Sequence, residues 1–176
     1  VMRLGAIYGP GAQYGMACAF ILNGKGLLAP ILVGSKKNRA GLIHVEDVVR
    51  VADFLSWQSE ANGEIYNVVD DCHPVEEVAT FIGEQLNNKP FTSFRLPSWV
   101  LKTLIKLVNK RAKQLGGTPV IDPELGKMTL LNSWMSNAKL MRLAEKNHVE
   151  KTLIRYLDPL PGLKSTIAWY KKEYKL

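Results

Sequence analysis

The sequence predicts an α/β protein whose second half is mostly helical. Apolar segments of strand length alternate with amphipathic segments of helix length from Val1 to Leu96. Beyond Pro97 the periodicity is that of helices only. The chain has 176 residues, of which 47% are hydrophobic. This length and composition allow a buried core and argue against disorder over the whole chain.

The first elements follow one another with clear punctuation. Val1 to Tyr8 is predicted to form one buried strand that ends at Gly9. A helix is expected over 14–23, and a short strand over 42–45. Acidic residues then begin a helix near Glu46, with its inward face formed by Val48, Val51, Ala52 and Leu55.

A second strand–helix unit covers 64–86. Residues 64–69 are predicted to form a buried strand. Pro74 suits the first turn of the helix that follows, whose inward face is Val75, Val78, Ala79, Ile82 and Leu86. A strand over 91–96 and a helix from Ser98 to Lys113 come next, with helical segments near 123–131 and 137–145. The chain ends in an amphipathic helix with inward Leu163, Ile167, Tyr170 and Tyr174.

The net charge indicates which partners the chain favours, and the cysteines indicate its cellular compartment. There are 23 Lys and Arg against 16 Asp and Glu, a net charge of +7 that favours anionic partners. The two cysteines and three histidines are scattered without metal-site spacing, so no metal site is predicted. Two reduced thiols and no secretory signal indicate a cytoplasmic protein. No apolar run approaches the roughly 20 residues that span a bilayer.

Four segments resemble one family. Residues 3–11 (RLGAIYGPG) resemble the Arg-Pro-x-x-x-Tyr-Gly-Pro-Gly strand and turn of extended short-chain dehydrogenases/reductases, the NAD-dependent epimerase/dehydratase family. Residues 42–48 (LIHVEDV) resemble its Phe-x-His-Val-Asp-Asp-Val segment, and 63–68 (GEIYNV) its Gly-x-x-Tyr-Asn-Val strand. Residues 162–170 resemble its closing helix. The order and approximate spacing are also those of the family, apart from Leu4 in place of its proline.

The resemblance implies the C-terminal part of a Rossmann-type NAD(P)-binding fold with a small, mostly helical substrate-binding domain. Residues 1–90 would hold the later Rossmann strands and helices, with an interleaved substrate-side segment at about 12–45. Residues 91–176 would form the substrate-binding region. The Phe94–Trp99 segment is similar to that of the steroid-dehydrogenase and dihydroflavonol-reductase branch.

Two signatures of the family are absent from the sequence. It has neither the Gly-x-x-Gly-x-x-Gly loop that approaches the pyrophosphate nor the catalytic Tyr-x-x-x-Lys pair. We therefore expect both to lie in an upstream segment of the same fold. The chain alone is expected to have no catalytic residue and weak or absent NAD or NADP binding.

The resemblance also implies site residues. Leu4, Gly5, Ala6 and Ile7 would line the nicotinamide pocket, with a plain core strand as the alternative. Tyr8, Arg39 and Trp99 would contact substrate. Arg39 would grip an anionic group as in nucleotide-sugar enzymes, with a solvated basic loop as the alternative.

Other polar residues have structural explanations. His44 is expected to be a hydrogen-bonded structural histidine and Asp47 a helix-start residue. Asp70 and Asp71 fit a loop between strand and helix. Along the helix from Ser98, the lysines at 102, 106, 110 and 113 share one side. That helix is interpreted as a substrate-domain helix, with a pocket lining or a membrane-surface helix as alternatives.

Three functions remain open on the sequence alone. The first is the substrate-binding part of an NAD(P)-dependent oxidoreductase acting on a secondary alcohol or ketone. The second is part of a nucleotide-sugar epimerase or dehydratase. The third is a non-catalytic ligand-binding module. Expected partners are a small-molecule substrate, the upstream segment and a second copy of the chain; nucleic acid is disfavoured, because no recognised binding module is present.

Overall fold

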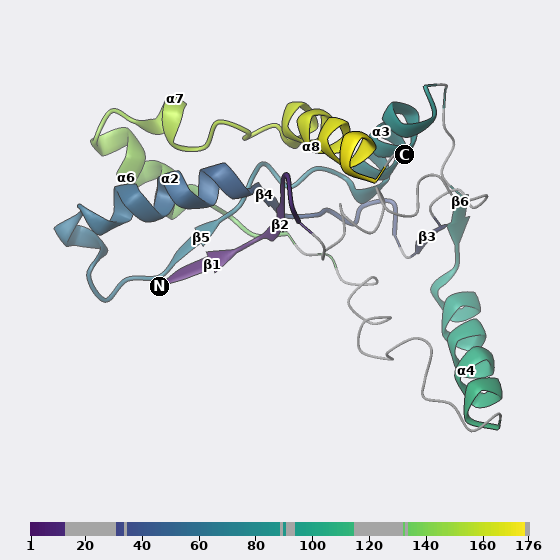
Figure 1. Cartoon of the computed structure of the whole chain (residues 1–176). Coiled ribbons are helices and arrows are strands. Elements are labelled where there is room, and N and C mark those ends of the chain that lie inside the picture. Colours follow the sequence, from purple (N-terminus) through teal and green to yellow (C-terminus); the bar gives the residue numbers. More distant parts are fainter. Residues whose placement is uncertain are drawn as a thin grey trace.

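The computed structural model describes residues 1–12, 31–33, 35–88, 90, 94–114, 132 and 134–174. Its strands are short and its helices longer, in this order: β1 (Met2–Leu4), β2 (Ala6–Tyr8), β3 (Ile31–Val33), β4 (Leu42–His44), α2 (Val45–Ser56), a 3-10 turn (Ser59–Ala61), β5 (Tyr66–Val68), α3 (Val75–Asn87), β6 (Phe94–Leu96), α4 (Ser98–Gln114), α6 (Ala138–Lys146), α7 (Glu150–Leu153) and α8 (Pro159–Glu173). Figure 1 shows their arrangement.

All strand pairs in the described part are parallel. β1 pairs with β5, β2 with β4, and β3 with β6. Parallel neighbours need a crossover connection, since a tight hairpin turn can join only antiparallel strands. Helix α2 lies between β1 and β5 in the chain, within the connection of that parallel pair. The α/β class predicted from the alternating pattern is therefore confirmed.

The first eight residues form two strands where one was predicted. β1 and β2 belong to different parallel pairs, and the chain changes partner at Gly5. The amide of Gly5 donates to the Val68 carbonyl at 2.9 Å, and that of Ala6 donates to the Gly41 carbonyl at 2.8 Å. The prediction of one buried strand was wrong in both respects: hydropathy does not report which neighbour a strand pairs with, and Leu4 and Ile7 are 37% and 39% exposed.

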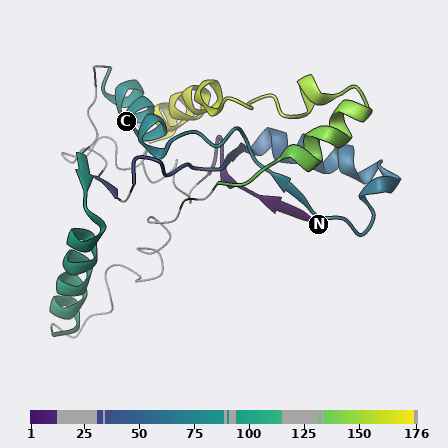
Figure 2. The ribbon, with the colours of Figure 1, turned by 180° about the vertical axis from the view of Figure 1, so that it is seen from behind.

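Two apolar clusters hold the described part together. One lies between α3, α8 and the β2–β4 pair, and the other between α2, α6, α7 and the β1–β5 pair (Figures 1 and 2). Fully or almost fully buried side chains of the first include Tyr8, Leu42, Ile82, Leu163 and Tyr170. Those of the second include Ile43, Val51, Val68, Leu140 and Ala144. The β2–β4 pair thus contributes to both clusters.

Most predicted helix faces are confirmed, with two corrections. In α3, Val78, Ala79, Ile82 and Leu86 are buried and Val75 is partly buried. In α8, Tyr174 is 44% exposed because the helix ends one residue before it. In α2, Ala52 is exposed, although its spacing placed it inward. Each correction concerns the edge of an apolar stripe.

The remaining elements agree with the sequence in part. The helices predicted from Ser98 and over 137–145 are present as α4 and α6, and the C-terminal part of the strand predicted over 91–96 is β6. β3 and α7 were not predicted. The segments predicted as helices over 14–23 and 123–131 lie outside the described residues, as do 91–93. The division into 1–90 and 91–176 stays a prediction.

Candidate functional site

Gly5 marks the point where the two parallel pairs separate. A Cβ at Gly5 would lie 2.7 Å from the Gly41 carbonyl oxygen and 3.1 Å from Cγ2 of Val69. The two backbones therefore approach too closely for any side chain at this position. Ligands of parallel α/β folds bind outside the carboxyl ends of the strands. Tyr8 and His44 close β2 and β4 at those ends, in register with each other.

Replacement of Gly5 by Ala should destabilise the fold without touching a titratable group. The added methyl has to push apart two backbones or the Val69 side chain. We expect the free energy of unfolding to fall by about 1–3 kcal/mol, as for other overpacked sites. Urea denaturation measures it. An unchanged midpoint would show that Gly5 and Gly41 do not approach each other as closely as described.

Tyr8 lies at the centre of the first apolar cluster. Its side chain is completely buried, and its hydroxyl donates to the Pro159 carbonyl at 3.2 Å. Its ring meets His44 edge-on at a centroid distance of 5.2 Å. Burial raises the pKa of Tyr8 far above its ordinary value, so the phenol stays protonated. Gly162 leaves room for this hydroxyl, since a Cβ there would lie 2.6 Å from it.

His44 joins the end of β4 to the start of α2. Its Nδ1 accepts a hydrogen bond of 3.3 Å from the Glu46 amide, capping the helix. The ring is 1% exposed and packs against Tyr156 at 4.4 Å between centroids. Burial lowers the pKa of His44, which favours the neutral ring with its proton on Nε2. The prediction of a hydrogen-bonded structural histidine is confirmed.

Asp47 does more than start a helix. Its carboxylate is fully buried and accepts from the amides of Arg155 at 3.1 Å and Tyr156 at 2.9 Å. The guanidinium of Arg50 donates to the same group. Asp47 therefore fixes the segment that carries Tyr156 against His44. The sequence indicated the helix start, but nothing in it pointed to partners more than a hundred residues away.

Asp70 is a second buried carboxylate, at the end of the β5 segment. It is 2% exposed, and its Oδ1 accepts from the amides of Leu42 at 3.1 Å and Cys72 at 2.8 Å. Its Oδ2 has no hydrogen-bond partner within the described residues. Burial raises the pKa of Asp70 from 3.8 to about 7, against the opposing effect of the two amide bonds. The predicted loop position is confirmed, and the burial is new.

Arg39 and Trp99, two predicted substrate contacts, lie on the surface. The Arg39 guanidinium donates to the Cys72 carbonyl at 3.0 Å, and its amide donates to Oδ1 of Asn132 at 2.8 Å. Trp99 is 69% exposed at the start of α4. Tyr8 is buried with its hydroxyl occupied. The structure thus pairs Tyr8 with His44 but does not bring Arg39 or Trp99 to them, and all three substrate contacts stay predictions.

The four predicted cofactor contacts divide into two kinds. The amides of Gly5 and Ala6 are both engaged in backbone hydrogen bonds. Leu4 and Ile7, in contrast, are 37% and 39% exposed. Leu4 ends β1 and Ile7 lies in β2, on either side of Gly5. The role of these four residues in lining a nicotinamide pocket stays a prediction.

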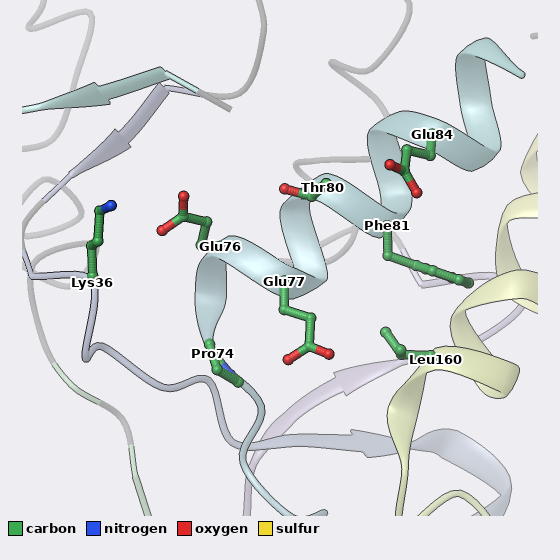
Figure 3. A pocket seen from close by; sticks show the side chains of 8 residues that line it. All are labelled: Lys36, Pro74, Glu76, Glu77, Thr80, Phe81, Glu84 and Leu160. Carbon is green, nitrogen blue, oxygen red and sulfur yellow. The ribbon is translucent and has the colours of Figure 1, made fainter. Parts of the chain in front are cut away.

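A hollow beside α3 does not fit a nucleotide. It is shallow, measures about 500 Å³ and lies between α3 and the start of α8 (Figure 3). Its polar lining consists of Lys36, Thr80 and three glutamates, namely Glu76, Glu77 and Glu84. Carboxylates would repel the phosphates of a dinucleotide. Residues 1–12 and 35–88, with the rest of the described part, also contain no group of three His, Cys, Asp or Glu that could hold a metal ion.

Solved structures resemble this chain in fold. No family model matches it, and no curated protein does. The epimerase Mth375 from Methanothermobacter thermautotrophicus matches 99% of the chain with a TM-score of 0.60 and 19% identity, over 43% of its own length. A GDP-L-fucose synthetase from Naegleria fowleri matches 99% of the chain with a TM-score of 0.60 and 16% identity, over 46% of its own length. The UDP-glucose 4-epimerase of Thermus thermophilus, in complex with NAD, matches 98% of the chain with a TM-score of 0.58 and 17% identity, over 46% of its own length.

These matches establish the fold. The chain is a mixed α/β structure with the parallel strand arrangement of Rossmann-type epimerases and reductases. It spans less than half the length of each of these proteins. At such identities the likeness carries no residue roles. No helix among the described residues is long and apolar enough to cross a membrane.

Proposed function

We propose that this chain, with the fold of Rossmann-type epimerases and reductases, is the substrate-binding part of an NAD(P)-dependent enzyme. The whole enzyme would move a hydride between the nicotinamide and a secondary-alcohol carbon. That step is shared by alcohol dehydrogenation and by 4-epimerisation of a sugar. The proposal is supported above all by the parallel pairs that separate at Gly5, in a fold shared along nearly the whole chain with enzymes of this kind.

The residues of this chain would orient the reactants. The exposed Leu4 and Ile7 side chains would line the nicotinamide pocket and exclude water from it. The cofactor supplies the hydride acceptor. Tyr8 would hold β2 in place through its hydrogen bond to Pro159, and His44 would fix the neighbouring strand end. Neither residue is positioned for proton transfer, since both are buried within the fold.

We further propose a nucleotide sugar as the substrate. Two of the matched structures are a UDP-glucose 4-epimerase and a GDP-L-fucose synthetase. Arg39 is the candidate for the diphosphate, because its guanidinium is anchored by Cys72 and exposed at the surface. The Phe94–Trp99 resemblance favours an apolar secondary alcohol or ketone instead. The two substrate classes are distinguished by experiment.

The test is a kinetic comparison on the full-length protein that contains this sequence. We expect NAD(P)H-linked or epimerising turnover of a UDP- or GDP-sugar. Arg39→Ala should raise KM for that substrate roughly 10- to 100-fold, the range for losing a charge-assisted hydrogen bond. Lys37→Ala, which removes a neighbouring exposed charge, is the matched control and should change KM little.

Three outcomes would change the assignment. Turnover of a steroid-like alcohol, with KM unaffected by Arg39→Ala, would replace the nucleotide sugar by an apolar substrate. Turnover by the 176-residue chain alone would contradict its role as a part that lacks the catalytic pair. Ligand binding without turnover by the full-length protein would favour a binding module.

A further inference from the structure

Helix α4 presents an exposed face that is basic and partly apolar. Lys106, Lys110, Arg111 and Lys113 are all exposed on it. Trp99 is 69% and Leu107 62% exposed. The helix has no acidic residue between Ser98 and Gln114. Such a combination of exposed cations, tryptophan and leucine differs from an ordinary solvated helix face, where acidic residues balance the charge.

The helical repeat places these residues on one side. Each residue advances about 100° around an α-helix, since a turn holds about 3.6 residues. Trp99, Lys106, Lys110 and Lys113 therefore fall on one stripe. Leu107 and Arg111, four residues apart, form a second stripe beside it. Trp99 and Leu107 thus lie beside the cations.

The position of α4 leaves this face accessible. Figures 1 and 2 show the helix standing away from α3 and α8, connected through β6. No other helix packs along it within the part of the chain that the structure describes. The exposed fractions of Trp99 and Leu107 are consistent with that arrangement.

We propose that the exposed face of α4 binds the surface of a membrane rich in anionic phospholipids. The ammonium groups and the guanidinium bind headgroup phosphates and carboxylates, while Trp99 and Leu107 enter the interface between headgroups and acyl chains. The helix, about 25 Å long, lies parallel to the bilayer. This inference is independent of the proposed enzymatic function.

The chemistry of the face favours lipid over nucleic acid. Both partners offer phosphates to Lys and Arg, and Trp99 could stack on a base as readily as it could enter an interface. Leu107 decides between them. A large exposed aliphatic side chain between cations contributes little to a phosphate backbone, whereas an interface buries it favourably.

Co-sedimentation of the full chain with vesicles tests the proposal. We expect binding to phosphatidylcholine vesicles that contain phosphatidylserine, and little binding to phosphatidylcholine alone. The double substitution Lys106→Gln/Lys110→Gln should weaken binding roughly 30-fold, since each lysine near an anionic surface contributes about fivefold. Brominated lipids should quench the emission of the wild-type protein, and Trp99→Phe should remove that quenching.

The matched control is Lys164→Gln/Lys172→Gln, which removes two exposed charges from α8. It should bind vesicles nearly as well as the wild type. All four lysines are on the surface, and far-ultraviolet circular dichroism confirms that the variants fold. Equal weakening by the α4 and α8 substitutions would mean that only net charge acts, and would overturn the proposal. Absence of vesicle binding, or displacement from vesicles by RNA with Trp99 unquenched by lipid, would overturn it as well.

Discussion

Replacing Asp47 by Ala is expected to lower the free energy of unfolding by about 2–4 kcal/mol, the cost of leaving two backbone amides without their hydrogen-bond acceptor. The substitution leaves the Arg155 and Tyr156 amides without their acceptor, while Arg50 keeps its ion pair with Glu46. Because Asp47 is fully buried, water cannot replace the lost carboxylate without opening the fold. Urea denaturation followed by circular dichroism measures the change.

Asp53→Ala on the same helix is the control for charge and helix propensity. Asp53 is exposed, so its replacement should cost no more than about 0.5 kcal/mol. Hydrogen exchange adds a local measure: the Tyr156 amide should lose protection in Asp47→Ala and keep it in Asp53→Ala. Equal costs for the two substitutions would contradict the role given to Asp47.

The stability of the chain should fall as the pH rises, because of Asp70. The folded state holds the pKa of this carboxyl at about 7, against 3.8 for an exposed Asp. Between these values the unfolded chain has released the proton and the folded chain retains it. The stabilising contribution is therefore complete below about pH 4 and lost as the pH rises through about 7. The difference between the two pKa values corresponds to about 4 kcal/mol in the free energy of unfolding.

Asp70→Asn should remove this dependence. The amide keeps an oxygen that can accept from Leu42 and Cys72 but has no proton to release over this range. We expect the wild type to be more stable at pH 5 than at pH 8, and the variant to show a smaller difference. Asp71→Asn removes an exposed neighbouring carboxylate and should leave the wild-type profile unchanged. A profile that persists in Asp70→Asn would assign it to another group.

The spacing of apolar residues and the residues at helix starts predicted those elements that depend on neighbours in the sequence. The inward face of α3 follows from the spacing of Val78, Ile82 and Leu86, and Pro74 marks its start. The start of α2 follows from the acidic residues after His44. What failed depends on partners far along the chain. The change of partner at Gly5 requires knowing that residues 41 and 68 lie on either side of it.

The candidate site was predictable to a similar extent. The sequence named Tyr8 as a substrate contact and His44 as a structural histidine, and the structure places the two residues in register. Neither composition nor periodicity predicted that Asp70 is buried. They also did not predict that Asp47 accepts hydrogen bonds from two distant amides. Both depend on segments that approach only in the folded chain. Arg39 and Trp99 could be named from a family pattern, but a pattern does not say which side chains end up beside one another.

The hydrogen bond between Tyr8 and Pro159 has a consequence for how the chain folds. It joins residues 151 positions apart, and the pairing of β1 with β5 also spans more than 60 positions. Contacts of such high sequence separation form slowly, because a long loop must close before they contribute. During synthesis β1 and β2 leave the ribosome long before α8 does. Until α8 is made, the apolar cluster around Tyr8 stays incompletely covered, and the yield of folded protein in cells should depend on chaperones.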